Sequence, residues 1–222
     1  MAKKTNGQAR QVVGKQRQRK KVQARGVARR RVLLDAARDL LTEVPIEELT
    51  FGQIATKAGV PEGSAYHFYA NKYDVLSSLA EELSAQFLDA YQEPIDASRI
   101  NTWHDLADLV IDRSAAIYAV DIAAVQVFLG GRTPPEIGLV DRTSVRTLST
   151  VLLELFDQFF VLPDVPNIDD VFYYFIQVTD LMFSLSVIEN GEITPTMLEE
   201  SKRAGKGYLA TYLPPMLTRR DS

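Results

Sequence analysis

Hydrophobic positions recur at helical spacing along the chain, and the first such run begins near residue 26. Its apolar residues fall three or four positions apart, as on one face of an α-helix: Leu33, Ala37, Leu40, Leu41 and Val44. Pro45 follows directly and ends the run, because a proline disfavours helical backbone at the residue before it. The pattern therefore predicts a first helix over about 26–44.

Two short amphipathic segments come next, with one glycine between them. Thr50 is a residue type favoured at the N-cap of a helix, and Ile54 supplies an inward face. Gly59 suits the positive φ of a sharp turn, and Pro61 suits the first turn of a following helix. The sequence predicts a helix-turn-helix whose second helix covers 61–68.

A long apolar stripe starts after Asn71 and Asp74, which form a cap-like pair, and continues to Pro94. Glycine and proline clusters divide the remainder into five further predicted helices, at roughly 101–119, 121–129, 135–160, 168–190 and 194–212. The segments 148–162 and 171–188 are apolar on more than one face and therefore need partners on more than one side. The pattern predicts an all-α protein.

Composition excludes several classes of function. The chain has 222 residues, of which 46% are hydrophobic and 24% charged, which is typical of soluble globular proteins. The absence of cysteine excludes disulfides, thiolate nucleophiles and Cys-based metal sites. His67 and His104 have no partners at metal-binding or catalytic-triad spacing, so we expect no metal and no cofactor. The sequence predicts no signal peptide and no membrane span, and we expect a cytoplasmic, nucleoid-associated protein.

Charge is distributed very unevenly along the chain. Residues 1–31 contain twelve Lys and Arg and no Asp or Glu, whereas the remaining residues carry thirteen basic and twenty-nine acidic residues, a net charge of −16. A segment this basic is attracted to a polyanion, and the attraction weakens as salt rises. We expect residues 1–25 to be a disordered arm that contacts the DNA backbone or minor groove, with a solvated tail that aids solubility as the alternative.

Eight short elements lie in order between residues 28 and 80: Ala36-Ala37, Leu40-Leu41, Thr50, Ile54-Ala55, Ala58-Gly59-Val60, Gly63-Ser64, Tyr66-His67 and Asn71-Lys72. Together these elements resemble the DNA-binding domain of the TetR family of bacterial transcriptional regulators. The chain departs from the family pattern at Pro45, Pro61, Glu62, Tyr69 and Tyr73. Glu62 is an acid at a position where the family commonly has a variable or basic group.

The resemblance implies a helix-turn-helix domain over 26–72 and a ligand-binding and dimerisation domain over 73–222. It places the helix over 61–68 in the major groove of double-stranded operator DNA, with one palindromic half-site for each subunit. The residues expected at phosphates are Thr50, Tyr66, His67 and Lys72, and those expected near base edges are Gln53, Gly63 and Ser64.

The C-terminal region carries no motif, so its organisation follows from the resemblance alone. The helices over about 168–212 would form a four-helix bundle with those of a second subunit, and the helices before them would enclose a pocket for an unknown small molecule. Candidate pocket residues are Trp103, Tyr118, Phe128, Phe156 and Phe175, with plain core or dimer interface as the alternative for each. Four arginines are expected to be surface charges, with recognition of an anionic effector as the alternative: Arg113, Arg132, Arg142 and Arg146.

The function that these expectations favour is a repressor that releases a palindromic operator on binding a small molecule. The alternatives are a transcriptional activator and a general DNA-coating protein that uses the basic arm. An enzyme with an incidental helix-turn-helix is disfavoured because the sequence has no cysteine, two isolated histidines and no glycine-rich phosphate loop.

Overall fold

The computed structural model describes the backbone of residues 24–130 and 135–220, and the side chains of 24–130 and 142–220. The described residues form helices joined by turns, with one isolated bridge between Phe160 and Arg219. The first helix covers 24–40, and the others are α2 (Phe51–Lys57), α3 (Glu62–Ala65), α4 (Lys72–Gln92), the 3₁₀ turn η1 (Ala97–Arg99), α5 (Trp103–Val120), α6 (Ile122–Ala124), the π-helical turn η2 (Val125–Leu129), α7 (Pro135–Phe159), α8 (Ile168–Asn190) and α9 (Pro195–Leu209).

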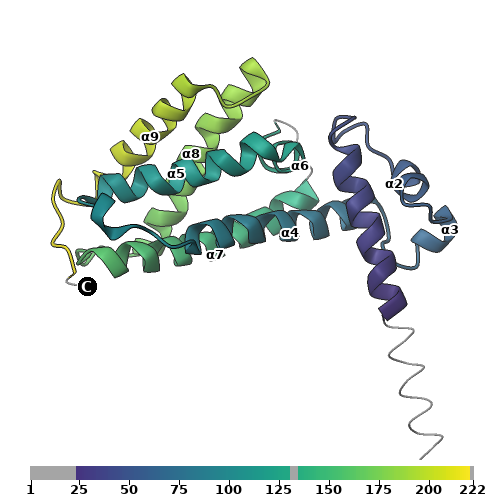
Figure 1. Cartoon of the computed structure of the whole chain (residues 1–222), viewed down its shortest axis with the longest axis horizontal. Helices are drawn as coiled ribbons and strands as arrows, with labels where there is room; N and C mark the ends of the chain where they lie inside the picture. The colour runs from purple at the N-terminus through teal and green to yellow at the C-terminus, as the bar shows by residue number, and fades with distance from the viewer. Residues whose placement is uncertain (1–23, 131–134, 221–222) are drawn as a thin grey trace, which may run out of the picture.

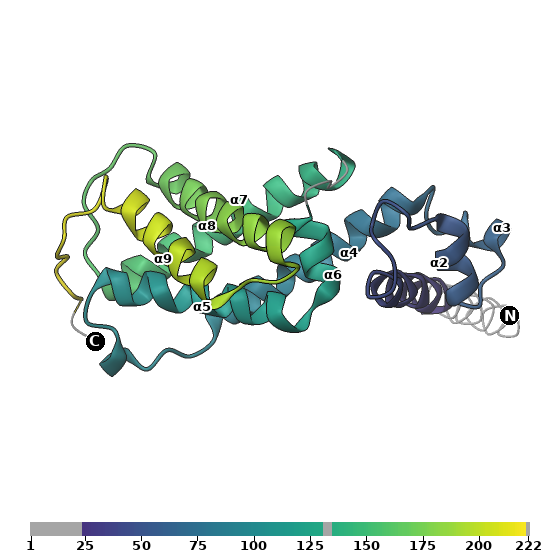
Figure 2. The ribbon, with the colours of Figure 1, turned by 90° about the horizontal axis from the view of Figure 1, so that it is seen from above.

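The molecule has two parts, which α4 connects (Figure 1). The first helix, α2 and α3 form a small domain at one end of α4, and the other helices form a larger bundle along the rest of α4. Seen from above, α3 and the C-terminal segment lie at opposite ends of the molecule (Figure 2). The predicted all-α architecture with a small N-terminal module and a larger helical domain is confirmed.

The first helix differs from its predicted bounds at both ends. It is already present at residue 24, before the expected start near 26. It ends at residue 40 rather than 44, because the backbone tightens into turns in which the Glu43 amide donates to the Leu40 carbonyl at 2.9 Å. The expected arm over 1–25 lies outside the described residues except for its last two positions, which are helical.

The C-terminal helices follow the predicted bounds closely, but one predicted helix differs in its type of helical turn. The segment expected as one helix over 121–129 consists of the short α6 followed by the π-helical turn η2. α9 ends at Leu209 rather than near 212, because the Thr211 amide donates to the Tyr208 carbonyl in a tighter turn.

α8 and α9 pack closely because Gly205 has no side chain. A Cβ atom at this position would lie 2.7 Å from Thr179 Cγ2 and 2.8 Å from Phe175 Cε2. Two ion pairs join α9 to α5, Lys202 with Asp112 at 2.7 Å and Lys206 with a carboxylate oxygen of Asp108 at 2.6 Å. α9 therefore lies against both α8 and α5.

α8 is the most apolar helix in the described part of the chain. By length and composition it would suffice to cross a membrane, since an 18-residue window has a mean hydropathy of 1.5. In this fold 39% of that window is buried inside the protein, and the helix packs against α7 and α9. The core helix of a helical bundle meets the same criterion.

Candidate nucleic-acid interface and effector cavity

α2 begins at Phe51 because Thr50 and Gln53 cap each other. The Thr50 hydroxyl oxygen accepts a hydrogen bond from the Gln53 amide at 3.2 Å, and Gln53 Oε1 accepts one from the Thr50 amide at 2.7 Å. The side-chain oxygen of Gln53, Oε1, therefore points back to the start of α2. The side-chain NH₂ group, which is a donor, remains as the part of Gln53 that can reach a nucleic acid.

The predicted corner between α2 and α3 is present at Gly59. Its φ is +63°, and the next amide, that of Val60, donates back across the turn to the Ala55 carbonyl at 3.0 Å. Ala55 and Ala65 are almost fully buried where the two helices meet, at 1% and 0% exposure. The small side chains allow this close approach, so the helix-turn-helix prediction is confirmed.

The second helix of the motif is shorter than the predicted 61–68. α3 spans four residues, Pro61 is its N-cap, and the backbone continues in tighter turns through Phe68. In these turns the His67 amide donates to the Ser64 carbonyl at 3.2 Å, and the Phe68 amide donates to the Ala65 carbonyl at 2.9 Å.

The candidate DNA-contacting side chains are mostly exposed. Thr50 and Gln53 lie at the start of α2, whereas Gly63, Ser64, Tyr66 and His67 lie on α3 and the turn after it. The Tyr66 ring is 52% exposed and rests on the Phe51 ring at a centroid distance of 4.7 Å, which orients the phenol without covering it. The arrangement offers hydroxyl, amide and imidazole groups to a partner along two adjacent short helices.

Lys72 makes contacts within the N-terminal domain. Its ammonium group donates to the Leu49 carbonyl at 2.7 Å and to the Glu47 carbonyl at 3.2 Å, and it lies 5.4 Å from the Tyr73 ring. These bonds fix the turn that precedes α2. Two of the three N–H groups of Lys72 are thus used within the domain, and its phosphate contact, which stays a prediction, would be made by the third.

Glu62 lies over α2. A Cβ atom placed on Gly52 would be 3.4 Å from Glu62 Oε2, and the Tyr66 hydroxyl is 3.4 Å from Glu62 Oε1. The carboxylate is thus held at the junction of α2 and α3, beside the tyrosine expected at a phosphate. Its negative charge acts against close approach of a phosphate at this point.

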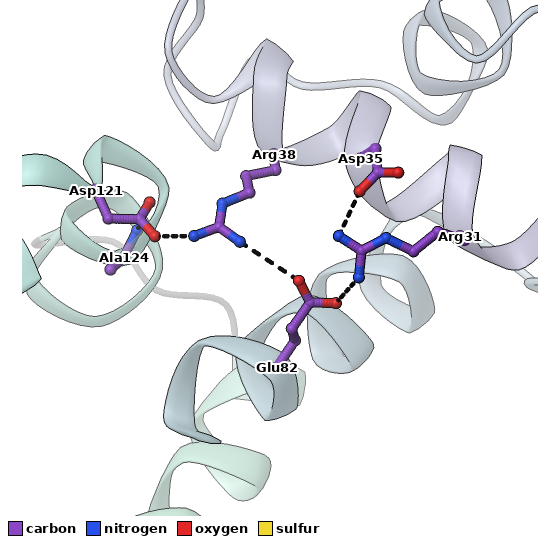
Figure 3. Close-up of polar contacts among 6 residues, drawn as sticks. All are labelled: Arg31, Asp35, Arg38, Glu82, Asp121 and Ala124. Atoms are coloured by element: carbon purple, nitrogen blue, oxygen red, sulfur yellow. Dashed lines mark hydrogen bonds and ion pairs between the residues drawn. The ribbon is translucent and has the colours of Figure 1, made fainter. Parts of the chain in front are cut away.

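Charged residues connect the N-terminal domain to the bundle (Figure 3). Arg31 pairs with Asp35 on its own helix and with Glu82 of α4, both at 2.6 Å. Arg38 pairs with Glu82 and with Asp121. Asp121 is 8% exposed and also accepts from the Ala124 amide at 3.2 Å, so one carboxylate both caps α6 and holds the first helix.

Gln126 of η2 forms a second connection between the domains. Its Oε1 accepts from the Ile46 amide at 2.7 Å, and its Nε2 donates to the Val44 carbonyl at 3.0 Å and to the Leu41 carbonyl. A single side chain thus satisfies three backbone groups of the turn between the first helix and α2. Phe128, two residues further along η2, faces the interior of the bundle.

A cavity of about 220 Å³ lies inside the bundle between α4, α5, η2, α7 and α8. Its lining comprises four aromatic residues, five aliphatic or amide residues, four serines and one acid: Phe87, Tyr91, Tyr118, Phe128, Val145, Leu148, Ile176, Gln177, Leu181, Ser84, Ser114, Ser144, Ser184 and Asp180. The sequence-based candidates Tyr118 and Phe128 lie in this lining.

Three other candidates for the cavity belong to the core instead. Trp103 is fully buried and donates from Nε1 to the Pro214 carbonyl at 2.9 Å. Phe156 packs edge-on against Phe172 at 5.0 Å, and Phe175 lies under Gly205. Residue type could not separate them from Tyr118 and Phe128, because core and cavity walls use the same aromatic side chains.

Sequence reasoning missed Phe87, Tyr91 and Asp180. Phe87 and Tyr91 belong to the apolar stripe predicted between Asn71 and Pro94, and apolar spacing alone does not reveal that part of this stripe faces a cavity. Asp180 could have been singled out from the sequence, because it is a charged residue within the most apolar segment of the chain. Burial raises the pKa of Tyr91 strongly, with a smaller contribution from the negative charge of Asp180.

Four arginines were the candidates for recognising an anionic effector, and those that the structure describes are absent from the described lining of this cavity. Arg113 donates to the carbonyls of Ala90, Glu93 and Pro94 and thereby caps the end of α4. Arg146 pairs with Asp170 and stacks 4.1 Å over the Tyr173 ring. Arg142 is exposed, and Arg132 lies outside the described residues. Among the residues described, no three His, Asp or Glu side chains are grouped to hold a metal ion.

The fold and the site together define a helix-turn-helix domain joined to a helical domain that contains a cavity. The family model described as "Bacterial regulatory proteins, tetR family" matches residues 33–79, which cover most of the first helix, the motif and the start of α4. The N-terminal domain of this chain is therefore similar to the DNA-binding domain of the TetR family.

Individual relatives agree with this assignment. The chain is 37% identical over 62 residues to the HTH-type transcriptional regulator BetI of Klebsiella pneumoniae, a match that covers 28% of this chain and 32% of BetI. It is 32% identical over 89 residues to the fatty acid metabolism regulator protein of Bacillus subtilis, covering 40% and 45% of the two chains. The matched part thus spans less than half of either relative.

A solved structure extends the likeness to the whole fold. A TetR-family transcriptional regulator from Streptomyces coelicolor superimposes with a TM-score of 0.64 at 22% identity, over 83% of this chain and 99% of that one. The C-terminal bundle is therefore shared in architecture, whereas the sequence likeness is concentrated in the N-terminal domain.

Proposed function

We propose that this protein is a transcriptional repressor that binds a palindromic operator as a homodimer and releases it when a small molecule occupies the cavity. The observation that carries the proposal is the α2–α3 corner, a tight turn with a small buried core beneath it and exposed polar groups above it. Such a corner places a short helix in the major groove, and phosphate contacts beside it set the register.

A stripe of exposed apolar side chains on α8 supports the dimer. Tyr174, Leu181, Leu185 and Ile188 are 49%, 59%, 39% and 61% exposed, and their spacing puts them on one side of the helix. A contiguous apolar surface on a soluble protein marks an interaction site, and a second copy of the same helix is its natural partner in a two-fold arrangement. α8 and α9, within residues 168–212, would then form the four-helix interface.

The dimer is tested by sedimentation equilibrium of two charge-introducing variants. Ile188→Glu places a carboxylate in the proposed interface and is expected to shift the protein to monomer. Val120→Glu is the matched control, because Val120 is an exposed apolar residue at 85% exposure that lies off the stripe, at the end of α5. Dimers of both variants, or monomers of both, would contradict the proposed interface.

The DNA-binding function is tested by selecting bound sequences from a random duplex pool at physiological salt. We expect a palindromic motif with half-sites about one helical turn or a multiple apart, of order ~34–36 Å for each turn. Tyr66→Ala and His67→Ala are expected to weaken binding to this motif, whereas Arg99→Ala, which removes an exposed cation on η1, should leave it unchanged.

The same experiment separates the general DNA-coating alternative. A specific regulator keeps an affinity gap of order ~10³-fold or more between its operator and random DNA, whereas a coating protein shows little gap. If no motif emerges and truncation of residues 1–23 abolishes binding, the protein is a basic-arm DNA binder. Reporter expression from the selected operator then distinguishes repression from activation.

A further inference from the structure

α3 begins with an acidic side chain that is exposed to solvent. Glu62 is the first residue of this helix, and Glu62, Gly63 and Ser64 are all exposed. α3 lies on the side of the N-terminal domain that is away from the helical bundle (Figure 1 and Figure 2). The Glu62 side chain is therefore available to a partner that binds the α2–α3 corner.

Two contacts hold the Glu62 carboxylate at the junction of α2 and α3. The Tyr66 hydroxyl, one helical turn further along the chain, lies 3.4 Å from Glu62 Oε1. Gly52 of α2 leaves open the space beside the carboxylate, since a Cβ atom at Gly52 would lie 3.4 Å from Oε2 and 3.7 Å from Oε1. The carboxylate therefore has a defined position, and its remaining lone pairs can accept hydrogen bonds from a partner.

The negative charge of Glu62 is unfavourable beside the DNA backbone. The ion pairs within the described part of the N-terminal domain join Arg31 to Asp35 and Lys57 to Glu43, and they do not include Glu62. A phosphate close to this carboxylate would be repelled. An ionised carboxylate accepts hydrogen bonds and donates none. Glu62 can therefore face DNA favourably only where the DNA presents a hydrogen-bond donor.

In the major groove, only cytosine and adenine present such a donor. Guanine presents the acceptors N7 and O6, and thymine presents the acceptor O4, so both oppose a carboxylate. Adenine presents its N6 amine beside the acceptor N7, a pair that a side-chain amide matches and a carboxylate does not. Cytosine presents its N4 amine without an acceptor on the same base edge. A carboxylate at the start of α3 therefore favours cytosine over the other three bases.

We propose that Glu62 reads a cytosine in each half-site of the operator by accepting a hydrogen bond from the N4 amine of that base. The inference rests on the proposed function, because it requires α3 to lie in the major groove. Tyr66 holds the carboxylate in place, and the negative charge penalises the acceptor groups of guanine and thymine at the same position. Glu62 is thereby a determinant of sequence specificity, although its charge weakens attraction to the backbone.

The first test compares the motifs that wild type and two variants select from the random duplex pool. For wild type, we expect one position in each half-site where replacing cytosine lowers affinity by about 5–150-fold, the usual cost of one mismatched base pair. Glu62→Ala should remove the preference at this position and leave the other positions unchanged. Glu62→Gln should raise adenine relative to cytosine there, because a side-chain amide matches N6 and N7 of adenine.

Glu81→Gln is the matched control for the loss of one negative charge. Glu81 is an exposed acid on α4, outside the α2–α3 corner. Removing this charge should change affinity for all DNA sequences by the same factor and leave the base preference at every position unchanged. A base preference that shifts equally in Glu62→Gln and Glu81→Gln is a general effect of charge and overturns the proposal.

The second test removes the amine itself. In the selected operator, 2-pyrimidinone replaces the cytosine at the Glu62-dependent position, which keeps the ring but deletes the N4 amine. Wild type should lose about as much affinity as Glu62→Ala loses on the unmodified operator, whereas Glu62→Ala should bind both operators equally. An equal loss in wild type and Glu62→Ala would show that the amine is not bound by Glu62. A purely structural role of Glu62 in the α2–α3 corner would not produce the expected coupling.

The outcomes of the selection separate this inference from the proposed function. A palindromic motif that is the same for wild type and Glu62→Ala overturns the role of Glu62 and leaves the proposed function intact. A motif in which the Glu62-dependent position is an A·T pair overturns the choice of cytosine and also leaves the proposed function intact. Absence of any motif overturns both proposals, because no base is then read.

Discussion

Replacing Gln126 by alanine tests whether one side chain of η2 holds the N-terminal domain against the bundle. The variant removes the acceptor of the Ile46 amide and the donor to the Val44 and Leu41 carbonyls. A net contribution of about 1 kcal/mol for each hydrogen bond gives about 3 kcal/mol, and because the site is partly exposed, water recovers some of it, which leaves roughly 2 kcal/mol. That corresponds to an about 30-fold larger equilibrium constant for local opening of the turn.

Amide hydrogen exchange measures this opening directly at Ile46. We expect exchange at Ile46 to accelerate about 30-fold in Gln126→Ala under conditions where exchange reports the opening equilibrium, while amides in α8 keep their protection. Gln158→Ala, on the exposed side of α7, is the matched control and should change neither. Unchanged exchange at Ile46 would refute the argument that Gln126 holds this turn.

Gln126→Glu tests the same three hydrogen bonds, because it keeps the acceptor for the Ile46 amide and replaces the donor to the Val44 and Leu41 carbonyls by a second acceptor. One carboxylate oxygen can still accept from Ile46, but the other would face the Val44 and Leu41 carbonyls, so the folded state favours the protonated acid. The pKa of the new carboxyl is then higher in the folded than in the unfolded state, where it is about 4.3. Stability should therefore fall as the pH rises from about 4 to 7, and an unfolding free energy that does not fall over this range contradicts the geometry.

Three further predictions address the fold. Gly59→Ala forces a β-carbon into a φ of +63° and should destabilise the N-terminal domain by about 1–2 kcal/mol in urea denaturation; no loss would mean that the turn relaxes. Gly205→Ala places a Cβ 2.8 Å from Phe175 Cε2 and should lower stability by about 1–3 kcal/mol, whereas Gly207→Ala, which meets no atom within 4 Å, should raise it by about 0.5–1 kcal/mol. Burial alone would raise the pKa of Asp105, but hydrogen bonds donated at the start of α5 lower it below 3.8. The wild type should therefore lose stability as the pH falls through this folded-state pKa, and Asp105→Asn should lack that loss; an identical acid transition in both proteins would contradict the capping role.

Local signals explain what the sequence predicted well. Thr50 and Gly59 act through bonds to residues within five positions, so their roles as cap and turn were readable without any knowledge of the tertiary fold. Apolar spacing gave the long helices within a few residues for the same reason. The end of the first helix and the length of α3 were less accurate, because the choice between α-helical and tighter turns depends on small backbone differences that residue type does not encode.

Long-range contacts account for what could not be predicted. Lys72 has the residue type of a phosphate ligand, and its bonds to Glu47 and Leu49 depend on a turn more than twenty residues away. Trp103 has the residue type of a pocket wall, and its partner at Pro214 is 111 residues distant. Asp180 was visible as a charge in an apolar segment, but its place in a cavity depends on how five helical elements meet.

The segment over 121–129 is where the two domains and the cavity meet. Asp121 holds the first helix through Arg38, Gln126 holds the turn after it, and Phe128 lines the cavity, all within eight residues. Between them the α-helical hydrogen-bond ladder changes to a π-helical turn, which is a less regular and more easily rearranged backbone. A ligand that displaces Phe128 must therefore move η2 against two fixed attachments to the N-terminal domain. Under the proposed function, we infer that occupancy of the cavity would change the orientation of the α2–α3 corner through these side chains, each of which can be removed by substitution.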